Sequence, residues 1–298
     1  MDEAAILKDV VDVATATARD HIVPLLLHSA RERKLDGSIV TEADRAASSA
    51  LVGALTTILD VPVVSEEMPA DEQIANWNQA FERTADDRDT GANPSTSGCL
   101  WCIDPLDGTS NFANGLPFFA VSVALLREGR PVIGVVHAPM LRETYSARRG
   151  HGAYCNGIRL PLRRPAARLR DAIAGVDLKR LPAPLAARLA ARPPYHSQRN
   201  VGSSAIELAY AAAGRYDVYL HGLQKLWDYA ASVLLLTEAG GAVTALGGHD
   251  FWSQDPWQRS VVAATTEDLL LPWRDWIERA ANAAQVPDGG LEASGSSR

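Results

Sequence analysis

Several features that mark common classes of protein are scarce or absent from this chain. Three cysteines in 298 residues, an odd number, do not make the disulfide framework of a small secreted domain. No run approaches the ~20 apolar residues that a membrane-spanning helix needs, and a net charge of −7 gives no basic surface for nucleic acid. The first residues, MDEAAILKDVVD, are acidic and unlike a secretory signal. We therefore expect a cytoplasmic protein with neither a nucleic-acid nor a membrane partner.

Some short motifs with a known mechanism are also missing. The chain has no G-x-x-x-x-G-K-[ST] and no G-x-G-x-x-G, so nucleotide-triphosphate and dinucleotide binding lack support. Cys99 and Cys102 form a C-x-x-C, but they lie in the apolar run CLWCI, where residues three apart point to opposite faces of a strand. A zinc site would need two more ligands, and Cys155 is the only other thiol. We interpret these cysteines as buried strand residues.

The chain does contain the composition of an ordinary globular protein, with 47% hydrophobic and 22% charged residues. Its first part predicts two helices, a short strand and then a meander of strands. Pro24 should interrupt the first helix, and Thr41 with Asp44 is close to a capping box at the start of the second. These elements are expected at residues 3–34, 41–59, 61–65, 99–103, 118–126, 131–138 and 144–147.

The second half alternates strands with helices, which argues for a mixed or parallel sheet between helices. We divide the chain into an N-terminal subdomain (1–165), a C-terminal subdomain (166–285) and a disordered tail (286–298). The polar, turn-rich segment 68–98 predicts a flexible insertion with a short helix near 74–81. It would act as a lid, as a dimer contact or as an inert loop. Strands are expected near 171–176, 196–201, 216–220, 242–246 and 261–264, and helices at 183–192, 203–214, 228–239 and 267–284.

Acidic residues gather where apolar segments end. The backbone holds such acids rigidly near the core, where they need counter-charge or a proton. Oxygen ligands without His or Cys favour Mg²⁺ or Mn²⁺ over zinc. Pro105 stiffens the turn between two of the acids, and after Gly108 a helix would open with free amides that suit a phosphate. The acids are Glu66 and Glu67 after VPVVS, Asp104 and Asp107 after CLWCI, and Asp228 in LWDYAAS.

The stretch DPLDG, residues 104–108, fits other aspartate-rich motifs poorly. An EF-hand loop needs acids at alternating positions followed by a distal glutamate. Phosphatases of the haloacid-dehalogenase type use D-x-D. The D-x-x-D spacing matches neither pattern. On this motif alone, a plain polar turn stays open as an alternative to a metal site.

Three segments together resemble the signatures of the inositol monophosphatase superfamily, in the family's order: SEE (65–67), DPLDGTSNF (104–112) and WDYAA (227–231). The likeness extends over residues 34–241. It implies an α/β fold of the layered α+β kind, an αβαβα sandwich with an N-terminal antiparallel sheet and a C-terminal mixed sheet. It also implies a phosphoric monoester hydrolase that is Mg²⁺-dependent, lithium-sensitive and homodimeric, and that acts on a small phosphorylated metabolite.

The resemblance implies a role for each matching residue. Thr109 and Asp44 match the pair that orients the attacking water, so the expected catalytic residues are Glu66, Thr109 and Asp44, although Asp44 is equally explained as a helix cap. Gly108 and Thr109 would present amides to the phosphate, and Lys34 matches a lysine near the active-site loop. Two or three Mg²⁺ ions, or Mn²⁺, would be held by Glu66, Asp104 and the Leu106 carbonyl, by Asp104, Asp107 and Asp228, and by Glu67 nearby.

Substrate specificity is expected to lie in the second half of the chain. Gly202, Ser203 and Ser204 match positions that touch the substrate's hydroxyl-bearing ring. His221 stands seven residues before Asp228, where inositol-preferring members carry a glutamate, which argues against inositol phosphate itself. We expect a small phosphorylated polyol as substrate. The alternatives are a 3′(2′),5′-bisphosphate nucleotidase, a sugar or histidinol phosphatase and, from another class, a non-enzymatic interaction protein that keeps the fold.

Overall fold

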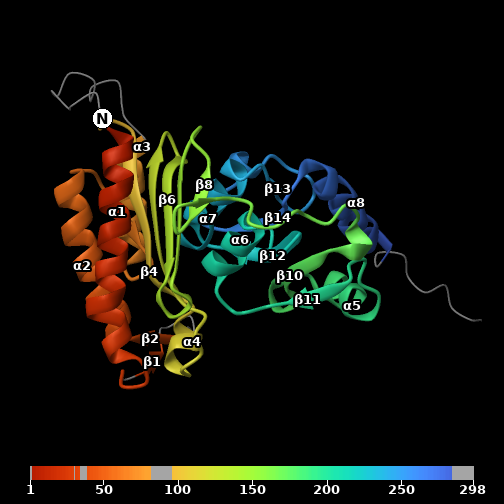
Figure 1. The fold of residues 1–298 in the computed structure, drawn as a ribbon, viewed down its shortest axis with the longest axis horizontal. Helices are drawn as coiled ribbons and strands as arrows, with labels where there is room; N and C mark the ends of the chain where they lie inside the picture. The colour runs from red at the N-terminus through yellow and green to blue at the C-terminus, as the bar shows by residue number, and fades with distance from the viewer. Residues whose placement is uncertain (1, 30, 34–38, 82–95, 284–298) are drawn as a thin grey trace, which may run out of the picture.

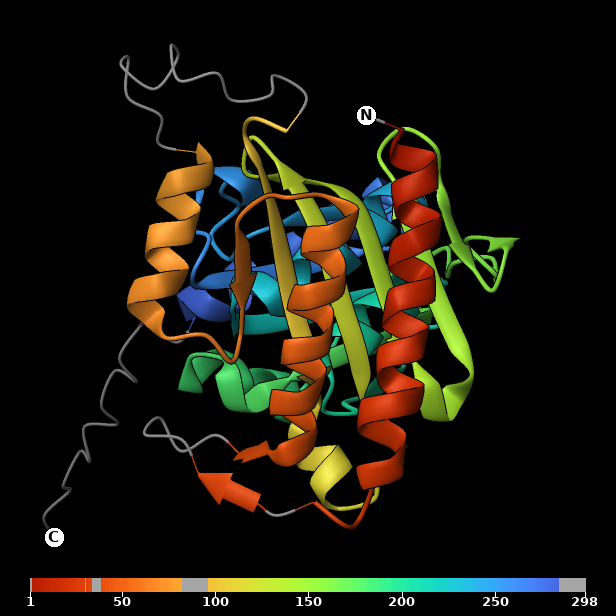
Figure 2. The same ribbon diagram turned by 90° about the vertical axis from the view of Figure 1, so that its left-hand side faces the viewer.

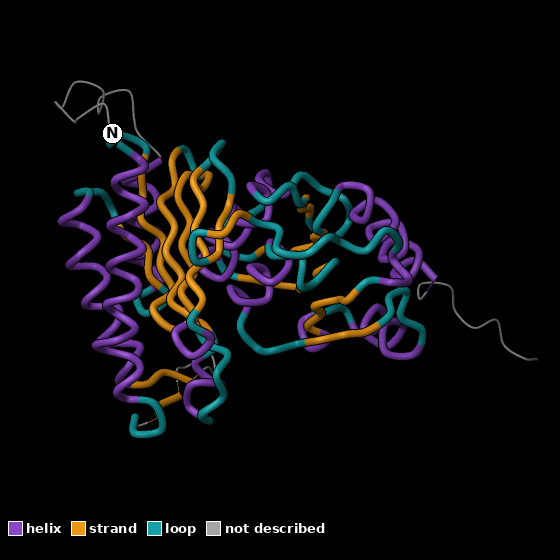
Figure 3. The backbone as a smooth tube through the Cα atoms, viewed as in Figure 1, coloured by secondary structure: helices purple, strands orange, loops and turns teal. Residues whose placement is uncertain are grey.

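Helices and sheets alternate in five layers (Figures 1 and 3). The computed structural model describes residues 2–29, 31–33, 39–81 and 96–283. Two helices cover one face of a seven-stranded sheet, two more separate that sheet from a five-stranded one, and a last pair covers the far face of the second sheet. The predicted layered α/β sandwich is thus confirmed.

The first layer consists of α1 (Glu3–Thr17) and α2 (Glu42–Ile58), which lie side by side on the outer face of the first sheet (Figure 2). After α1 the chain continues as a π-helical turn and then a 3₁₀ turn that contains Pro24. The expected interruption at Pro24 is confirmed, since proline cannot donate the next helical hydrogen bond. At the start of α2, the Thr41 amide donates to the Asp44 carboxylate over 2.7 Å, which confirms the capping box.

The first sheet is antiparallel except at one edge, where β3 runs parallel to β4. The expected antiparallel sheet is therefore present, with one parallel pairing at its edge. A parallel return needs a long crossover, and the connection between β3 and β4 supplies one that includes α3 (Ala70–Phe81), which contacts both strands. The order is β3 (Val63–Ser65), β4 (Cys99–Asp107), β5 (Ala120–Arg127), β6 (Arg130–Ala138), β7 (Glu143–Arg148), β8 (Ala153–Cys155) and β9 (Ile158–Arg159).

Successive residues of β4 serve different hydrophobic cores. Cys99 and Trp101 pack with α1 and α2, whereas Leu100 and Cys102 pack on the opposite face, toward the middle helices. All three cysteines are free and buried. This confirms that the C-x-x-C is a pair of strand residues on opposite faces and not a redox motif.

The middle layer contains α6 (Ser204–Ala212) and α7 (Leu226–Glu238), which are buried along most of their length because a sheet covers each side. α7 approaches β6 so closely that a Cβ at Gly134 would lie 2.7 Å from the Ala231 carbonyl oxygen. No larger residue fits there without moving the helix. This close packing fixes the beginning of α7, and therefore the position of Asp228, relative to the first sheet.

The second sheet is mixed, as predicted, with parallel pairing of β10 to β11 and β12 and antiparallel pairing around β14. α5 (Ala183–Ala191) and α8 (Glu267–Ala283) cover its far face, around a third hydrophobic core. A separate hairpin joins β1 (Arg31–Arg33) to β2 (Ile39–Thr41). The strand order is β11 (Ser197–Arg199), β10 (Ile173–Asp177), β12 (Val218–Gln224), β14 (Arg259–Ala264) and β13 (Ala242–Thr244).

The remaining predictions concern the insertion and its short helix, the tail, the subdomain boundary and the absence of a membrane-spanning helix. The short helix expected near 74–81 is present as α3, while residues 82–95 of the predicted insertion and the whole predicted tail lie outside the described residues. The subdomain boundary at 165/166 stays a prediction. None of the helices in the described ranges is both long and apolar enough to cross a bilayer.

Candidate active site

A cavity of about 960 Å³ opens between the two halves of the chain. Its walls come from the end of β4, the short helix α4 (Thr109–Ala113), the beginnings of α6 and α7, and the end of β12. Most of the residues predicted for metal and substrate therefore meet in one place, although they are far apart in sequence.

Three aspartates converge at one end of this cavity. Asp104, Asp107 and Asp228 each offer a carboxylate oxygen within 4.8 Å of the others. In a regular strand, residues three apart point to opposite faces. Here the pairing of β4 with β5 shifts register between Asp104 and Asp107, around Pro105, so both side chains reach the same site. Asp228 reaches it from the first turn of α7.

Burial and mutual repulsion make these carboxylates hard to ionise without a cation. Burial and the charges of Glu66, Asp107 and Asp228 raise the pKa of Asp104 well above its usual value. Burial raises the pKa of Asp107, against a hydrogen bond from Ser203. Burial and the Asp107 charge raise the pKa of Asp228 to about 8. Within the described ranges, no lysine or arginine forms an ion pair with the three aspartates. A donor set made only of carboxylates suits Mg²⁺ or Mn²⁺.

The protein holds each aspartate through one carboxylate oxygen. Asp104 Oδ1 accepts from the Leu106 amide over 3.0 Å, and Asp228 Oδ2 accepts from the Lys225 amide over 2.8 Å. Asp107 Oδ2 accepts from the Ala205 amide over 2.9 Å and from the Ser203 hydroxyl. These bonds fix the side chains and orient them toward a common point, as preorganised metal ligands require.

Thr109 and Asp44 form the pair that the sequence predicted. The Thr109 hydroxyl lies 3.0 Å from Asp44 Oδ1 and 2.9 Å from the Leu106 carbonyl oxygen, so two acceptors compete for its proton. The second oxygen of Asp44 accepts from Thr41 at the start of α2. Burial raises the pKa of Asp44, and the bonds from Thr41 oppose that rise. The two interpretations of Asp44, helix cap and partner of Thr109, therefore both hold.

The other predicted ligands lie around this centre. Glu66 lines the cavity, whereas Glu67 is not part of its wall. Glu67 is still near, because its charge adds to burial in raising the pKa of Asp44. The Leu106 carbonyl belongs to the wall and accepts from Thr109. Lys34 lies outside the described residues.

The predicted substrate contacts line the cavity too, but several of them already have partners. Gly108 has a φ of +85°, and a Cβ there would lie 2.7 Å from the Phe118 carbonyl oxygen, so the turn before α4 requires glycine. The Gly202 amide donates to the Asn200 side chain over 2.9 Å. The Ser203 hydroxyl is directed at Asp107. Their contact with a substrate stays a prediction, as does that of Ser204.

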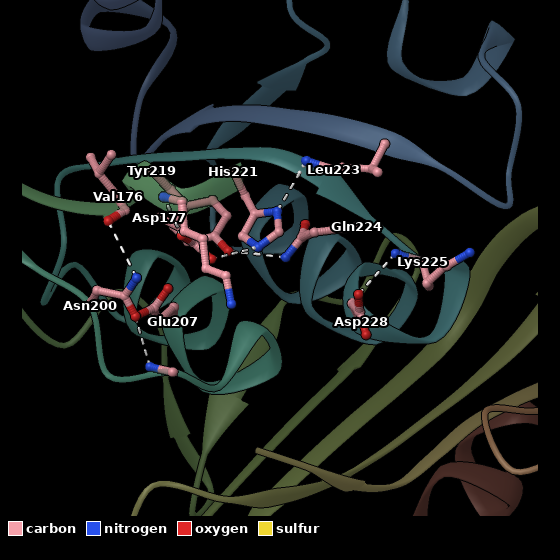
Figure 4. A network of polar contacts seen from close by, with 12 residues as sticks. Val176, Asp177, Asn200, Glu207, Tyr219, His221, Leu223, Gln224, Lys225 and Asp228 are labelled. Carbon is pink, nitrogen blue, oxygen red and sulfur yellow. Dashed lines mark hydrogen bonds and ion pairs between the residues drawn. The ribbon is translucent and has the colours of Figure 1, made fainter. Parts of the chain in front are cut away.

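His221 is buried in the cavity wall with both ring nitrogens engaged (Figure 4). Its Nδ1 accepts from the Leu223 amide over 3.2 Å, and its Nε2 lies 3.3 Å from Asp177 Oδ2. Burial would raise the pKa of Asp177, but the hydrogen bond and charge of His221 outweigh burial and lower it. The histidine is thus held by the protein, and its contact with a substrate stays a prediction.

Several residues of the wall were missed by the sequence analysis. They belong to segments without a recognisable motif, and tertiary structure alone brings them to the cavity. One signal could have found the first of them. The carboxyl ends of parallel strands lie at the same edge of a sheet, which places Asp177 of β10 beside His221 of β12. The missed residues are Asp177, Lys179, Arg180, Asn200, Glu207 and Gln224.

Comparison with known proteins gives relatives in one family. The family model described as "Inositol monophosphatase family" matches residues 5–285. An inositol-1-monophosphatase of Mesorhizobium japonicum is 41% identical over 168 residues, which are 50% of this chain and 58% of the relative. A fructose-1,6-bisphosphatase/inositol-1-monophosphatase of Thermotoga maritima is 35% identical over 216 residues, 71% of this chain and 73% of the relative. Nus factor SuhB of Salmonella typhimurium is 33% identical over 243 residues, 76% and 88% of the two chains.

Comparison with solved structures shows the same fold over most of the chain. An extragenic suppressor protein SuhB from Bartonella henselae superposes with a TM-score of 0.74 at 27% identity, covering 92% of this chain and 99% of the other. A Thermotoga maritima IMPase gives 0.75 at 26% identity, with coverage of 95% and 99%. The predicted resemblance and the predicted fold are both confirmed.

Proposed function

The chain belongs to the inositol monophosphatase family, and on that premise we propose that it hydrolyses a small-molecule phosphomonoester in a Mg²⁺-dependent reaction. Membership supports the prediction of a phosphoric monoester hydrolase. The observation that carries the proposal is the convergence of Asp104, Asp107 and Asp228 beside the Thr109–Asp44 pair. A merely structural acidic cluster would not need a hydroxyl and a second buried carboxylate at its side.

The residues fit a divalent-cation site, since the buried Asp104 and Asp107 and the partly buried Asp228 repel one another and have no cationic partner among the described side chains. We assign one ion to Glu66, Asp104 and the Leu106 carbonyl, and a second to Asp104, Asp107 and Asp228. Glu67 would act through water or a third ion. Bound there, Mg²⁺ or Mn²⁺ would lower the pKa of a bound water molecule and would neutralise charge on the phosphate.

The chain's own groups then position the reactants. Thr109 donates to Asp44, so its oxygen remains able to accept a hydrogen bond from the attacking water. Asp44 keeps that hydroxyl oriented because its other oxygen is fixed by Thr41. The amides of Gly108 and Thr109, at the cavity wall, would donate to phosphate oxygens. Orientation of this kind contributes about 10²- to 10⁴-fold to proton-transfer steps.

For the substrate we propose a small phosphorylated polyol, with a 3′(2′),5′-bisphosphate nucleotide, a sugar phosphate or histidinol phosphate as alternatives. His221 replaces the glutamate expected of inositol-preferring members, and its ring is held by Asp177 and the Leu223 amide. Relatives named for inositol-1-monophosphatase and for fructose-1,6-bisphosphatase activity leave both sugar and inositol esters in the panel. Lithium sensitivity, a homodimer and a cytoplasmic location complete the proposal.

The test is release of phosphate from a panel of esters with Mg²⁺, with EDTA and with added Li⁺. The panel contains inositol 1-phosphate, fructose 1,6-bisphosphate, 3′-phosphoadenosine 5′-phosphate and histidinol phosphate. We expect at least one to be hydrolysed with Mg²⁺, with loss of activity in EDTA and inhibition by Li⁺. Absence of hydrolysis in both Mg²⁺ and Mn²⁺, or hydrolysis that survives EDTA, would overturn the proposal and favour the non-enzymatic interaction protein.

A further inference from the structure

A tight 3₁₀ turn, Leu178–Arg180, follows β10 and borders the cavity. It is fixed at both ends. The Asp177 carboxylate accepts from the Lys179 amide over 2.9 Å. The Arg180 carbonyl lies against Gly222 of β12, so closely that a Cβ at Gly222 would be 1.7 Å from its oxygen. The turn is therefore locked onto the strand that carries His221.

This turn brings uncommitted positive charge into the cavity. Lys179 and Arg180 both line it, and so does Lys225. Among the described residues, none of these three side chains forms an ion pair. All three residues are exposed, and their side chains border a cavity that is otherwise rich in acids. Their charges are available to a ligand.

The two acids on the same side of the cavity are already satisfied (Figure 4). Asp177 is held by His221 and by the Lys179 amide. Glu207 accepts from the Val201 amide over 2.5 Å, and burial raises its pKa to about 7, so it is partly neutral near neutral pH. This part of the cavity is therefore positive, in contrast to the carboxylate end.

The positive turn and the carboxylate end belong to one site. Lys179 and Arg180 line the same cavity as Asp104, Asp107 and Asp228. A single small molecule in a cavity of about 960 Å³ can reach both ends.

We propose that Lys179 and Arg180 form a subsite for a second anionic group, a phosphate or a carboxylate, on the substrate whose phosphoester is held at the aspartates. The inference rests on the proposed function. Arginine suits the task because its planar guanidinium donates two parallel hydrogen bonds to an oxyanion. The adjacent ammonium of Lys179 adds charge. The preferred substrate therefore carries two anionic groups separated by a polyol or sugar-like body.

A matched series of linear hexitols tests the subsite: glucitol 6-phosphate, glucitol 1,6-bisphosphate and 6-phosphogluconate. They share one phosphoester and differ in a second phosphate or a carboxylate. The measurements are kcat/KM and, for any compound that is not turned over, Kd by calorimetry with Mg²⁺. We expect at least one doubly anionic compound to exceed glucitol 6-phosphate by about 10- to 100-fold, as a charge-assisted contact gives. Whichever anion gains identifies the chemistry.

Arg180→Met and Lys179→Met should remove most of this preference, mainly through KM, and should leave glucitol 6-phosphate within about twofold. Arg188→Met, an exposed arginine of α5 outside the cavity, is the matched control. Equal constants for all three compounds, or equal losses on all three in Arg180→Met, would overturn the subsite. Such a result leaves the proposed function standing if phosphate is released, whereas no release from any ester in Mg²⁺ refutes the proposed function itself.

Discussion

The hydroxyl of Ser203, at the start of α6, donates to the carboxylate of Asp107, at the end of β4. The two residues are 96 positions apart in the chain. Ser203 also accepts from the Ile206 amide as the N-cap of its helix. One side chain thus begins a helix of the middle layer and orients a carboxylate of the first sheet. The candidate metal site is complete only when both parts of the fold are assembled.

Ser203→Ala should weaken metal binding more than it weakens the fold. Loss of the donor raises the pKa of Asp107 further and frees its orientation. Partners of this kind change metal affinity by about 10-fold or more. A titration of activity against Mg²⁺ at constant pH should therefore shift to about 10-fold higher concentration. Ser253→Ala, outside the cavity, should leave the titration unchanged. An unshifted titration in Ser203→Ala would show that Asp107 needs no such support.

Asp104→Asn should abolish nearly all activity at any practical Mg²⁺ concentration. Asp104 is the carboxylate assigned to both ions, and its amide variant lacks the charge that attracts them. Phosphate release on the best substrate of the panel is the measurement. Asp60 is an exposed acid in the loop that follows α2, so Asp60→Asn makes the same chemical change and should keep full activity. Turnover near that of the unmodified protein in Asp104→Asn would refute the metal assignment.

Thr109→Val should lower kcat by about 100-fold with little change in KM, because in the proposed reaction the hydroxyl would position water and would not bind the substrate body. Thr41→Val separates this role from the helix cap. It removes a bond to the other oxygen of Asp44 and should cost about 1 kcal/mol of unfolding free energy, measured by urea denaturation. Its kcat should stay within a few-fold. Equal kcat in Thr109→Val and the unmodified protein would leave Asp44 as a cap alone.

The metal-free protein should lose stability as the pH rises. Burial and Asp107 raise the pKa of Asp228 to about 8 in the folded protein, against about 3.9 in an unfolded chain. Between those values the folded state binds more protons, so the free energy of unfolding falls with rising pH. The stabilisation is complete below about pH 4 and lost above about pH 8. Thermal unfolding in EDTA should show Tm lower by roughly 5 °C or more at pH 8 than at pH 5.

Two comparisons isolate this effect from other titrations. Mg²⁺ should raise Tm more at pH 8 than at pH 5, since it binds the ionised carboxylates. Asp228→Asn removes the titrating group and should flatten the decline measured in EDTA. A decline of the same size in Asp228→Asn would assign it to other acids.

The parts of the site that sequence reasoning could reach are those fixed by local structure. Asp104 and Asp107 end a buried strand, Asp228 lies in the first turn of a helix, and Thr41 with Asp44 is a capping pattern. In each case apolar periodicity places the element, and the acid follows from its position at the end. Family resemblance then joined these separate ends into one site, which no local pattern could do.

The parts of the structure that sequence reasoning could not predict depend on contacts between distant segments. The parallel edge of β3 depends on a crossover whose length alone does not decide the direction of the next strand. The engaged nitrogens of His221 depend on Asp177, which reaches it only because β10 and β12 pair in parallel. Lys179 and Arg180 lie in an ordinary-looking polar turn. Nothing local distinguishes them from solvated surface residues.

Gly222→Ala should displace the turn that carries Lys179 and Arg180 while sparing the carboxylate end. The new Cβ would overlap the Arg180 carbonyl at 1.7 Å, so the turn must move away from β12. Overpacking of this kind costs about 1–3 kcal/mol. We expect loss of the preference for doubly anionic hexitols and an unchanged kcat on glucitol 6-phosphate. Urea denaturation measures the stability cost, and Tm shows that the variant folds.

Gly53→Ala is the matched control, because it makes the same change within α2, where an added Cβ meets nothing within 4 Å. Alanine in a helix interior should stabilise the protein by about 0.5–1 kcal/mol and leave substrate preference intact. If Gly222→Ala kept the full preference for a second anion, the position of the turn would not matter to recognition, and Lys225 would be the remaining cation to examine. If it instead lost activity on every ester equally, the turn would support the carboxylate end as well, because β12 leads directly into Asp228.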